Sequence, residues 1–274
     1  MNDKPFLLDP SRPKQKPIPF VRPLLPDFKE VEAQFQEILS TGMVTTGSYA
    51  EQLGERVAAF LGVKHAVAVS SCTTGLLLAI QSLGLPKGSE VILPSFTFMA
   101  SGIGPVWNQL KLRFVDVDCN TMNIDPHEVE KNVTESTSAI LGVHQFGNPA
   151  PIEDLETIAR KHNLALLFDS AHGFGSFHHG QPVGRFGQGE VFSMSPTKLM
   201  IAAEGGVVAT NNAQVAEHVR IGRNYGNPGN YDCLFPGLNA RMSEFHAIVA
   251  MHSLDKLEMA SKTRNEVAER YRET

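Results

Sequence analysis

Apolar runs of strand length alternate with helix-length segments along most of this 274-residue chain. A short continuous apolar run is typical of a strand that is covered on both faces of a parallel sheet. The predicted strands are 65–70, 90–94, 112–117, 139–144, 165–169, 191–194 and 206–210. Helices are expected near 98–107, 126–132 and 151–162. This alternation predicts an α/β fold with a mostly parallel sheet between layers of helices.

Two more helices are expected ahead of the first predicted strand. Asp27 precedes the first of them, and Gly42 would end it. Ser48 and Glu51 have the spacing of a capping box at the start of the second helix, which Gly62 would end. Both segments therefore carry start and stop signals of their own.

Composition excludes several classes of protein. The net charge is -5, from 24 basic and 29 acidic residues, and no dense Lys/Arg block is present, so a nucleic-acid partner is not expected. Cys72, Cys119 and Cys233 are far apart and odd in number, which predicts neither a disulfide framework nor a Cys-x-x-Cys metal site and favours a reducing cytoplasm. No apolar run approaches the roughly 20 residues that span a bilayer, so no membrane segment is expected.

Two residues near the carboxyl ends of predicted strands indicate cofactor chemistry. Asp169 closes the apolar run 165–169, and Lys198 lies further along in F-S-M-S-P-T-K. Open α/β sheets bind ligands at the carboxyl ends of their strands. A lysine amine can bond to an aldehyde, and a carboxylate can hold a protonated pyridine nitrogen. Together they predict a site for pyridoxal 5'-phosphate (PLP).

A phosphate site is expected where S-S-C-T-T-G leads from a predicted strand into a helix. Thr73 and Thr74 would offer amides and hydroxyls at the helix start, and Ser193 another hydroxyl. Taken alone, these Ser and Thr residues would be explained by helix capping. Taken together with Lys198, they favour a binding site for the phosphate of PLP. Phe98, just past a strand end, is expected to stack on the cofactor ring, whereas Phe96 is expected in the core.

Other chemistries have less support. His172, His178 and His179 could suggest a metal ion, but no carboxylate or cysteine shares a regular ligand spacing with them, so no metal site is expected. The chain also lacks a G-x-G-x-x-G after a strand, a G-K-[ST] loop and a G-x-S-x-G elbow.

Many ordered motifs support a family resemblance. They include V-I-L-P-S-F-T-F-M-A-S, V-H-Q-F-G-N-P, D-S-A-H-G, F-S-M-S-P-T-K and G-L-N-A-R-M-S-E. From Ile18 onward the chain resembles the DegT/DnrJ/StrS family of PLP-dependent sugar aminotransferases, within the fold-type I aspartate aminotransferase superfamily. The resemblance implies a fold-type I large domain with a mostly parallel, seven-stranded type of sheet between helices.

The resemblance also implies a role for each matching position. Lys198 would bond covalently to PLP, Asp169 would hold the ring nitrogen, and these two would be the catalytic residues. The other cofactor-binding positions would be His172 facing the ring hydroxyl, Phe98 stacking on the ring, Thr73, Thr74 and Ser193 at the phosphate, and Asn239 at the phosphate of the neighbouring subunit. The active enzyme would therefore be a homodimer with shared sites.

The implied reaction is the transfer of an amino group from an amino acid, expected to be glutamate, to a keto sugar, expected to be nucleotide-linked. It would belong to amino-deoxysugar or surface-polysaccharide biosynthesis in the cytoplasm. One alternative is a related PLP-dependent sugar dehydratase, but such relatives typically carry histidine in place of Lys198. Another is a truncated PLP-binding chain without turnover.

Three positions depart from the family pattern. Cys72 and Ala203 stand where glycine is common or usual, and Tyr225 stands where histidine is frequent. Cys72 would place a side chain near the phosphate, and Ala203 and Tyr225 would change substrate contacts. None of these changes removes the two catalytic residues.

Three parts of the chain are expected. Residues 1–17 would form an N-terminal arm, 18–240 the PLP-binding large domain, and 241–274 the start of a long helix. That helix would lead to a C-terminal subdomain, which is expected to be missing.

Overall fold

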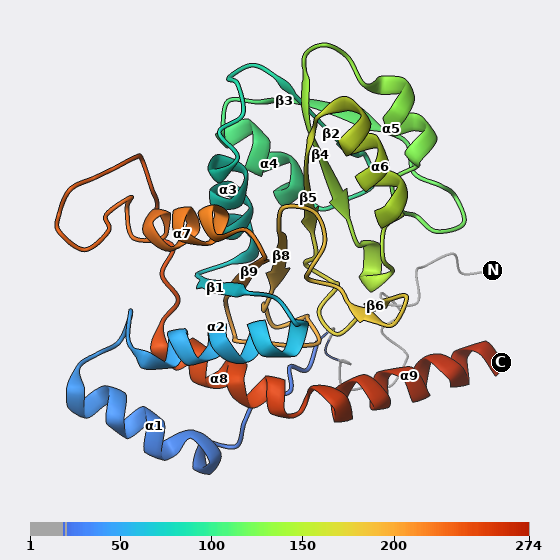
Figure 1. Cartoon of the computed structure of the whole chain (residues 1–274). Helices are drawn as coiled ribbons and strands as arrows, with labels where there is room; N and C mark the ends of the chain where they lie inside the picture. The colour runs from blue at the N-terminus through green and yellow to red at the C-terminus, as the bar shows by residue number, and fades with distance from the viewer. Residues whose placement is uncertain (1–18, 20, 274) are drawn as a thin grey trace, which may run out of the picture.

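A seven-stranded sheet forms the centre of the computed structural model, which describes residue 19 and residues 21–273 (Figure 1). The strand order is β1-β9-β8-β5-β4-β2-β3. The bounds are β1 His65–Val69, β2 Glu90–Pro94, β3 Lys111–Val115, β4 Thr137–Val143, β5 Ala165–Asp169, β8 Glu190–Ser193 and β9 Gly206–Thr210. Only β9 runs against its neighbours, β1 and β8, and the other pairs are parallel. The predicted α/β fold with a mostly parallel sheet is confirmed.

Helices cover both faces of this sheet (Figure 1). They are α1 Phe28–Thr41, α2 Ser48–Leu61, α3 Cys72–Ser82, α4 Met99–Trp107, α5 Pro126–Asn132, α6 Ile152–His162, α7 Ala213–Gly222, α8 Glu244–Asp255 and α9 Leu257–Glu273. A short hairpin, β6 Phe177–His178 and β7 Gln181–Pro182, and a 3-10 turn, Gln145–Gly147, complete the elements. No helix in the described part of the chain is long and apolar enough to cross a membrane.

Alternating side chains of each strand divide the core between the two faces. On one face, Val91 and Leu93 of β2 pack in a cluster with α3, α4 and α7. On the opposite face, Ile92 packs with α5 and α6, while Val207 of β9 packs with α2 and α8. Because both faces are buried, the central strands read as continuous apolar runs, and every predicted strand lies within two residues of its observed bounds.

The start of α2 differs from the prediction. Ser48 and Glu51 form no capping box, because the N-cap residue is Gly47, which has no side chain to accept a bond. The carboxylate of Glu244 instead accepts the N–H groups of Gly47, at 3.1 Å, and Tyr49, at 2.7 Å. Glu244 is only 1% exposed and comes from α8. A tertiary contact therefore replaces the expected local cap.

The C-terminal helix is also different from the expected one. Instead of one helix from Arg241, α8 and α9 follow one another with a break at Lys256. Helix α8 packs on α2 and buries Ala247 and Ile248. Along α9 only Leu257 is buried. Residues 244–255 are thus part of the packed core, while the predicted arm 1–17 lies outside the described residues.

Candidate active site

A cavity of about 590 Å³ opens where β4, β5 and β8 end and where α3 begins. Its volume is within the range of roughly 300–1,000 Å³ that is common for small-molecule sites. Six of the residues predicted from the sequence line it, namely Thr73, Phe98, Asp169, His172, Ser193 and Lys198. The strand ends therefore bring together residues that are up to 125 positions apart, as expected for an open α/β sheet.

Asp169 is the last residue of β5, whose apolar side chains place it at the cavity floor. The carboxylate belongs to a residue that is 4% exposed. Its Oδ2 accepts a hydrogen bond from the Ser101 hydroxyl at 2.6 Å, and its Oδ1 accepts the Ala171 N–H at 3.1 Å. A carboxylate can accept about four hydrogen bonds. Asp169 therefore keeps capacity for a donor in the cavity, such as a protonated ring nitrogen.

Ser101 is a site residue that the sequence reasoning missed. It lies in α4, is fully buried, and its Oγ is also 2.8 Å from the Thr97 hydroxyl, which borders the cavity. Ser101 is a small polar residue inside an apolar helix. The sequence does not show whether such a residue only packs in the core or also contacts Asp169. Only the folded structure, which brings Ser101 to the end of β5, reveals this contact.

Lys198 lies in the loop after β8 and is half buried. Burial lowers the pKa of its ammonium group, while the negative charge of Asp169 partly opposes that shift. The lower pKa increases the fraction of uncharged amine, which is the form that attacks a carbonyl carbon. Its backbone N–H donates to the Ser195 carbonyl at 3.0 Å, which fixes the turn that carries the lysine.

Aromatic and imidazole rings form one side of the cavity. His172 stacks on Phe146 with ring centroids 6.0 Å apart, and partial burial, followed by the charge of Lys198, lowers the pKa of His172. Phe146 in turn meets Phe96 edge-on at 6.1 Å. The core assignment of Phe96 is wrong, because it is 45% exposed and lines the cavity together with Phe98.

The two predicted threonines at the start of α3 have different environments. Thr73 lines the cavity. The Thr74 side chain is engaged in a capping box with Ser71, in which the Thr74 N–H donates to Ser71 Oγ at 3.1 Å and the Thr74 hydroxyl accepts the Ser71 N–H at 3.2 Å. Thr74 does not border the cavity, so its role at a phosphate remains a prediction. Ser193 borders it from the end of β8.

Cys72 is the first residue of α3 and lines the cavity beside Asp169. Its Sγ lies 4.0 Å from Oδ1 of Asp169 and 3.7 Å from the Val191 carbonyl. Burial and the charge of Asp169 raise the pKa of this thiol well above its usual value. The thiol therefore stays protonated and can donate weakly toward the carboxylate.

Asn239 lies apart from these residues. It is exposed, its Oδ1 accepts a hydrogen bond from Arg241 at 3.3 Å, and it does not line the cavity of its own chain. Its role at the site of a neighbouring subunit remains a prediction.

A smaller cavity of about 200 Å³ adjoins the first and shares Phe146, His172 and Lys198 with it. Arg264 of α9 lines this cavity and donates a hydrogen bond to the Lys198 carbonyl at 3.2 Å. Nothing in the spacing of the sequence links Arg264 to Lys198. A guanidinium with further N–H groups is thereby placed beside the lysine.

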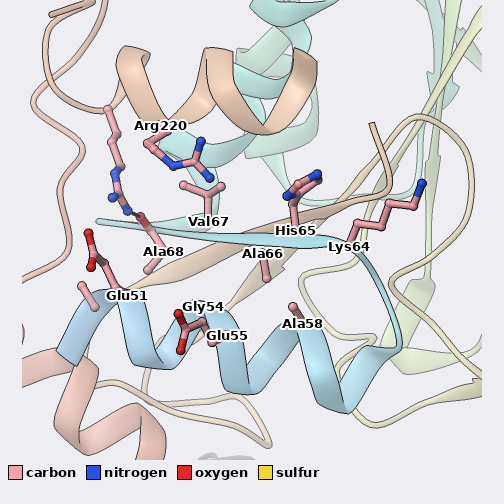
Figure 2. A pocket seen from close by; sticks show the side chains of 12 residues that line it. Glu51, Gly54, Glu55, Ala58, Lys64, His65, Ala66, Val67, Ala68 and Arg220 are labelled. Atoms are coloured by element: carbon pink, nitrogen blue, oxygen red, sulfur yellow. Dashed lines mark hydrogen bonds between the residues drawn. The ribbon is translucent and has the colours of Figure 1, made fainter. Parts of the chain in front are cut away.

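Another cavity, of about 280 Å³, lies at the edge strand β1 between α2 and α7 (Figure 2). Figure 2 shows Glu51 and Glu55 on α2 and Arg220 on the opposite side of the strand. Arg223 covers the strand edge by donating to the Ala68 carbonyl at 2.6 Å. None of the predicted site residues lines this cavity, and its mixed charges favour neither an anion nor a cation.

Comparison with known proteins agrees with the geometry. The model of the DegT/DnrJ/EryC1/StrS aminotransferase family matches residues 27–274. The dTDP-3-amino-3,6-dideoxy-alpha-D-galactopyranose transaminase of Aneurinibacillus thermoaerophilus is 33% identical, over 89% of this chain and 68% of that protein.

Two solved structures share the fold. DesI, determined in the presence of its TDP-sugar product, is 38% identical with a TM-score of 0.80, over 87% of this chain but only 60% of the DesI chain. Helicobacter pylori PseC, an aminotransferase of pseudoaminic acid biosynthesis, is 28% identical with a TM-score of 0.83, over 89% of this chain and 67% of that chain. The chain belongs to the DegT/DnrJ/EryC1/StrS aminotransferase family.

Proposed function

We propose that this chain carries the active site of a PLP-dependent aminotransferase that moves an amino group from an amino acid to a keto sugar. The observation that supports it best is the placement of Lys198 and Asp169 in one cavity, the first with a lowered pKa and the second held by Ser101. Enzymes of this family use PLP.

The cavity residues fit this cofactor. Lys198 would bond to its aldehyde, and the buried Asp169 would accept the ring N–H with its remaining capacity. Phe98 and His172 would contact the ring, and a phosphate would sit at the start of α3 beside Thr73 and Ser193, where a helix N-terminus favours an anion. The proposed sites also include Thr74 and, from the neighbouring subunit of a homodimer, Asn239.

Two residues of the chain would do the chemistry. Bound PLP supplies an aldehyde that exchanges amines and a ring that takes up electron density. As a free amine, the Nζ of Lys198 would be the base that takes the proton from the α-carbon of the amino donor and the acid that gives it back. The charge of Asp169 would keep a ring nitrogen protonated, and the hydrogen bond from Ser101 holds the carboxylate in place.

The names of the relatives support a proposal for the acceptor class. The relative from Aneurinibacillus is a transaminase of a dTDP-linked sugar, DesI has a TDP-sugar product, and PseC is an aminotransferase of pseudoaminic acid biosynthesis. We therefore propose a nucleotide-linked keto sugar as acceptor and glutamate as donor, in amino-deoxysugar or surface-polysaccharide biosynthesis. The three cysteines are free, which favours a cytoplasmic location. Lys198 disfavours the dehydratase alternative.

The proposal can be tested in two steps. Borohydride reduction of the PLP-loaded protein, followed by peptide mapping, is expected to place the pyridoxyl group on Lys198, and Lys198→Ala is expected to abolish that adduct. Mass spectrometry of a panel of nucleotide keto sugars incubated with glutamate is then expected to show an amino sugar. A dehydrated sugar without nitrogen would favour the dehydratase, and an adduct that persists in Lys198→Ala would show that the lysine assignment is wrong.

A further inference from the structure

Two imidazoles and a carboxylate meet where the β6–β7 hairpin lies against the start of α6. His178 ends β6, His179 follows it in the turn, and Glu153 lies in the first turn of α6. One ligand atom from each of the three residues lies within 4.8 Å of the other two. None of them lines the cavity that holds Lys198 and Asp169.

Both imidazoles direct the same ring nitrogen at one oxygen. Nε2 of His178 is 2.7 Å from Oε1 of Glu153, and Nε2 of His179 is 3.5 Å from that oxygen. The two rings lie 4.3 Å apart. The Glu153 side chain is largely exposed to solvent, and an exposed carboxylate is ionised at neutral pH. The cluster therefore offers two nitrogen ligands and one negatively charged oxygen.

These distances are close to what one metal ion requires. Zinc binds histidine nitrogen and carboxylate oxygen at about 2.0–2.2 Å, so two ligands of a tetrahedral ion lie roughly 3.3–3.6 Å apart. The His179–Glu153 separation already has this value, and the His178–Glu153 pair would open by less than about 1 Å. The His179 side chain is 79% exposed and that of Glu153 62%, which leaves room for an ion and for water at the fourth position.

A second histidine–glutamate pair in the same protein shows what distinguishes this cluster. Glu130 also receives an imidazole, with Nε2 of His162 at 2.9 Å from its Oε1. Its other neighbour is the ammonium group of Lys161, a cation with no lone pair for a metal. In the Glu153 cluster a second imidazole occupies the corresponding place. The Glu130 pair is therefore a matched control.

We propose that Glu153, His178 and His179 bind one divalent transition-metal ion, at a site separate from the proposed active site. Two imidazoles and one carboxylate suit a borderline ion, and zinc matches this donor set best. The expectation of no metal site rested on the lack of a carboxylate at a regular spacing from the histidines. The fold supplies one from α6, 25 positions before His178. A bound ion would connect the hairpin to α6.

Titration calorimetry of the PLP-loaded chain with zinc chloride tests this proposal. The chain is first stripped with a chelator, and the exposed thiols of Cys119 and Cys233 are alkylated, because thiols also bind zinc. One high-affinity ion per chain is expected. Glu153→Gln and His179→Ala are each expected to weaken its binding by about tenfold or more, because the loss of an outer-sphere partner alone costs about 10–100-fold.

The control variant is His162→Ala, which is expected to keep the affinity of the unmodified sequence. His179 is exposed, so His179→Ala is not expected to disturb folding and tests the zinc site directly. His178 is less exposed, and its replacement could disturb folding. Unchanged zinc affinity in Glu153→Gln and His179→Ala, or an equal loss in His162→Ala, would overturn the proposal. The borohydride adduct at Lys198 is expected in all of these variants, so a failure here is distinct from a failure of the proposed aminotransferase function.

Discussion

The hydroxyl of Ser101 donates a 2.6 Å hydrogen bond to Oδ2 of Asp169, and both residues are buried. The Ala171 N–H holds the other oxygen, so the plane of the carboxylate is fixed from two elements, α4 and the loop after β5. A carboxylate held in this way has a fixed orientation where it lines the cavity. Ser101 is therefore a positioning residue for the proposed ring-nitrogen partner.

Ser101→Ala is expected to leave PLP bound but to slow the half-reaction with glutamate by about tenfold or more, because a hydrogen bond to a charged group contributes about 1.5–3 kcal/mol. Stopped-flow absorbance of the cofactor measures this rate. Ser101→Thr, which keeps the hydroxyl, is expected to recover most of it. Equal rates in Ser101→Ala and the unmodified protein would leave the serine with a packing role only.

Asp169→Asn is expected to retain the fold and PLP, and to slow the same half-reaction by about 100-fold or more, the size of loss typical for removal of an electrostatic contact at the reacting centre. A neutral amide cannot stabilise a protonated ring as a carboxylate does. Its N–H₂ group would also face either Ser101 or the Ala171 N–H, both of which now donate. An unchanged rate would contradict the role proposed for Asp169.

The lowered pKa of Lys198 predicts a pH dependence for PLP capture. The amine must be uncharged to react, so the capture rate is expected to rise with pH, with a midpoint below the ordinary lysine value of 10.5. Asp169 raises the pKa of Lys198, so Asp169→Asn is expected to move the midpoint lower still. Absorbance measurements across pH in both proteins test the two shifts, and a midpoint that moves upward in the variant would refute the assigned cause.

Arg264 is expected to contribute to binding of the amino donor. Its guanidinium has donors beyond the one bound to the Lys198 carbonyl and lines the adjoining cavity, where it can bind a carboxylate. Arg264→Ala is expected to raise the KM for glutamate about tenfold or more with a smaller change in kcat. Arg272→Ala, on the same helix and paired with Glu269, is the matched control and is expected to change neither constant.

Asn239 tests the proposed homodimer. Because the residue is exposed and away from its own cavity, Asn239→Ala is expected to keep the fold but to weaken PLP binding about tenfold, through the loss of a hydrogen bond to the phosphate in a partner's site. Asn230→Ala, in an exposed loop of the same region, is the control. Light scattering that shows a PLP-loaded monomer, with a cofactor affinity unaffected by Asn239→Ala, would exclude the shared site.

The sequence was most informative where local composition sets the structure. The strand that ends in Asp169 is buried on both faces, so its apolar run identified both the strand and the position of the carboxylate. Thr73 and Ser193 were found by similar reasoning, because Thr73 lies in the first turn of the helix that follows β1 and Ser193 is the last residue of β8. The environment of a residue could thus be predicted where it depends on residues that are close in the sequence.

Contacts between distant elements were not predictable from spacing. Ser101 reaches Asp169 across 68 positions, and Arg264 reaches Lys198 across 66. The error at Phe96 has a similar cause. The sequence around an aromatic residue near a strand end does not show whether its side chain packs into the core or borders a cavity. In each case the relative placement of two elements decides the environment, and that placement has no local signature.

The carboxylate that caps α2 lies 195 positions after the Tyr49 N–H that it accepts. A ribosome adds about 5–20 residues per second, so roughly 10–40 s separate the synthesis of the two groups. During that interval the first turn of α2 has to satisfy its N–H groups with water, and α8 is not yet available to cover it. The first turn of α2 is thus completed only after α8 has been synthesised.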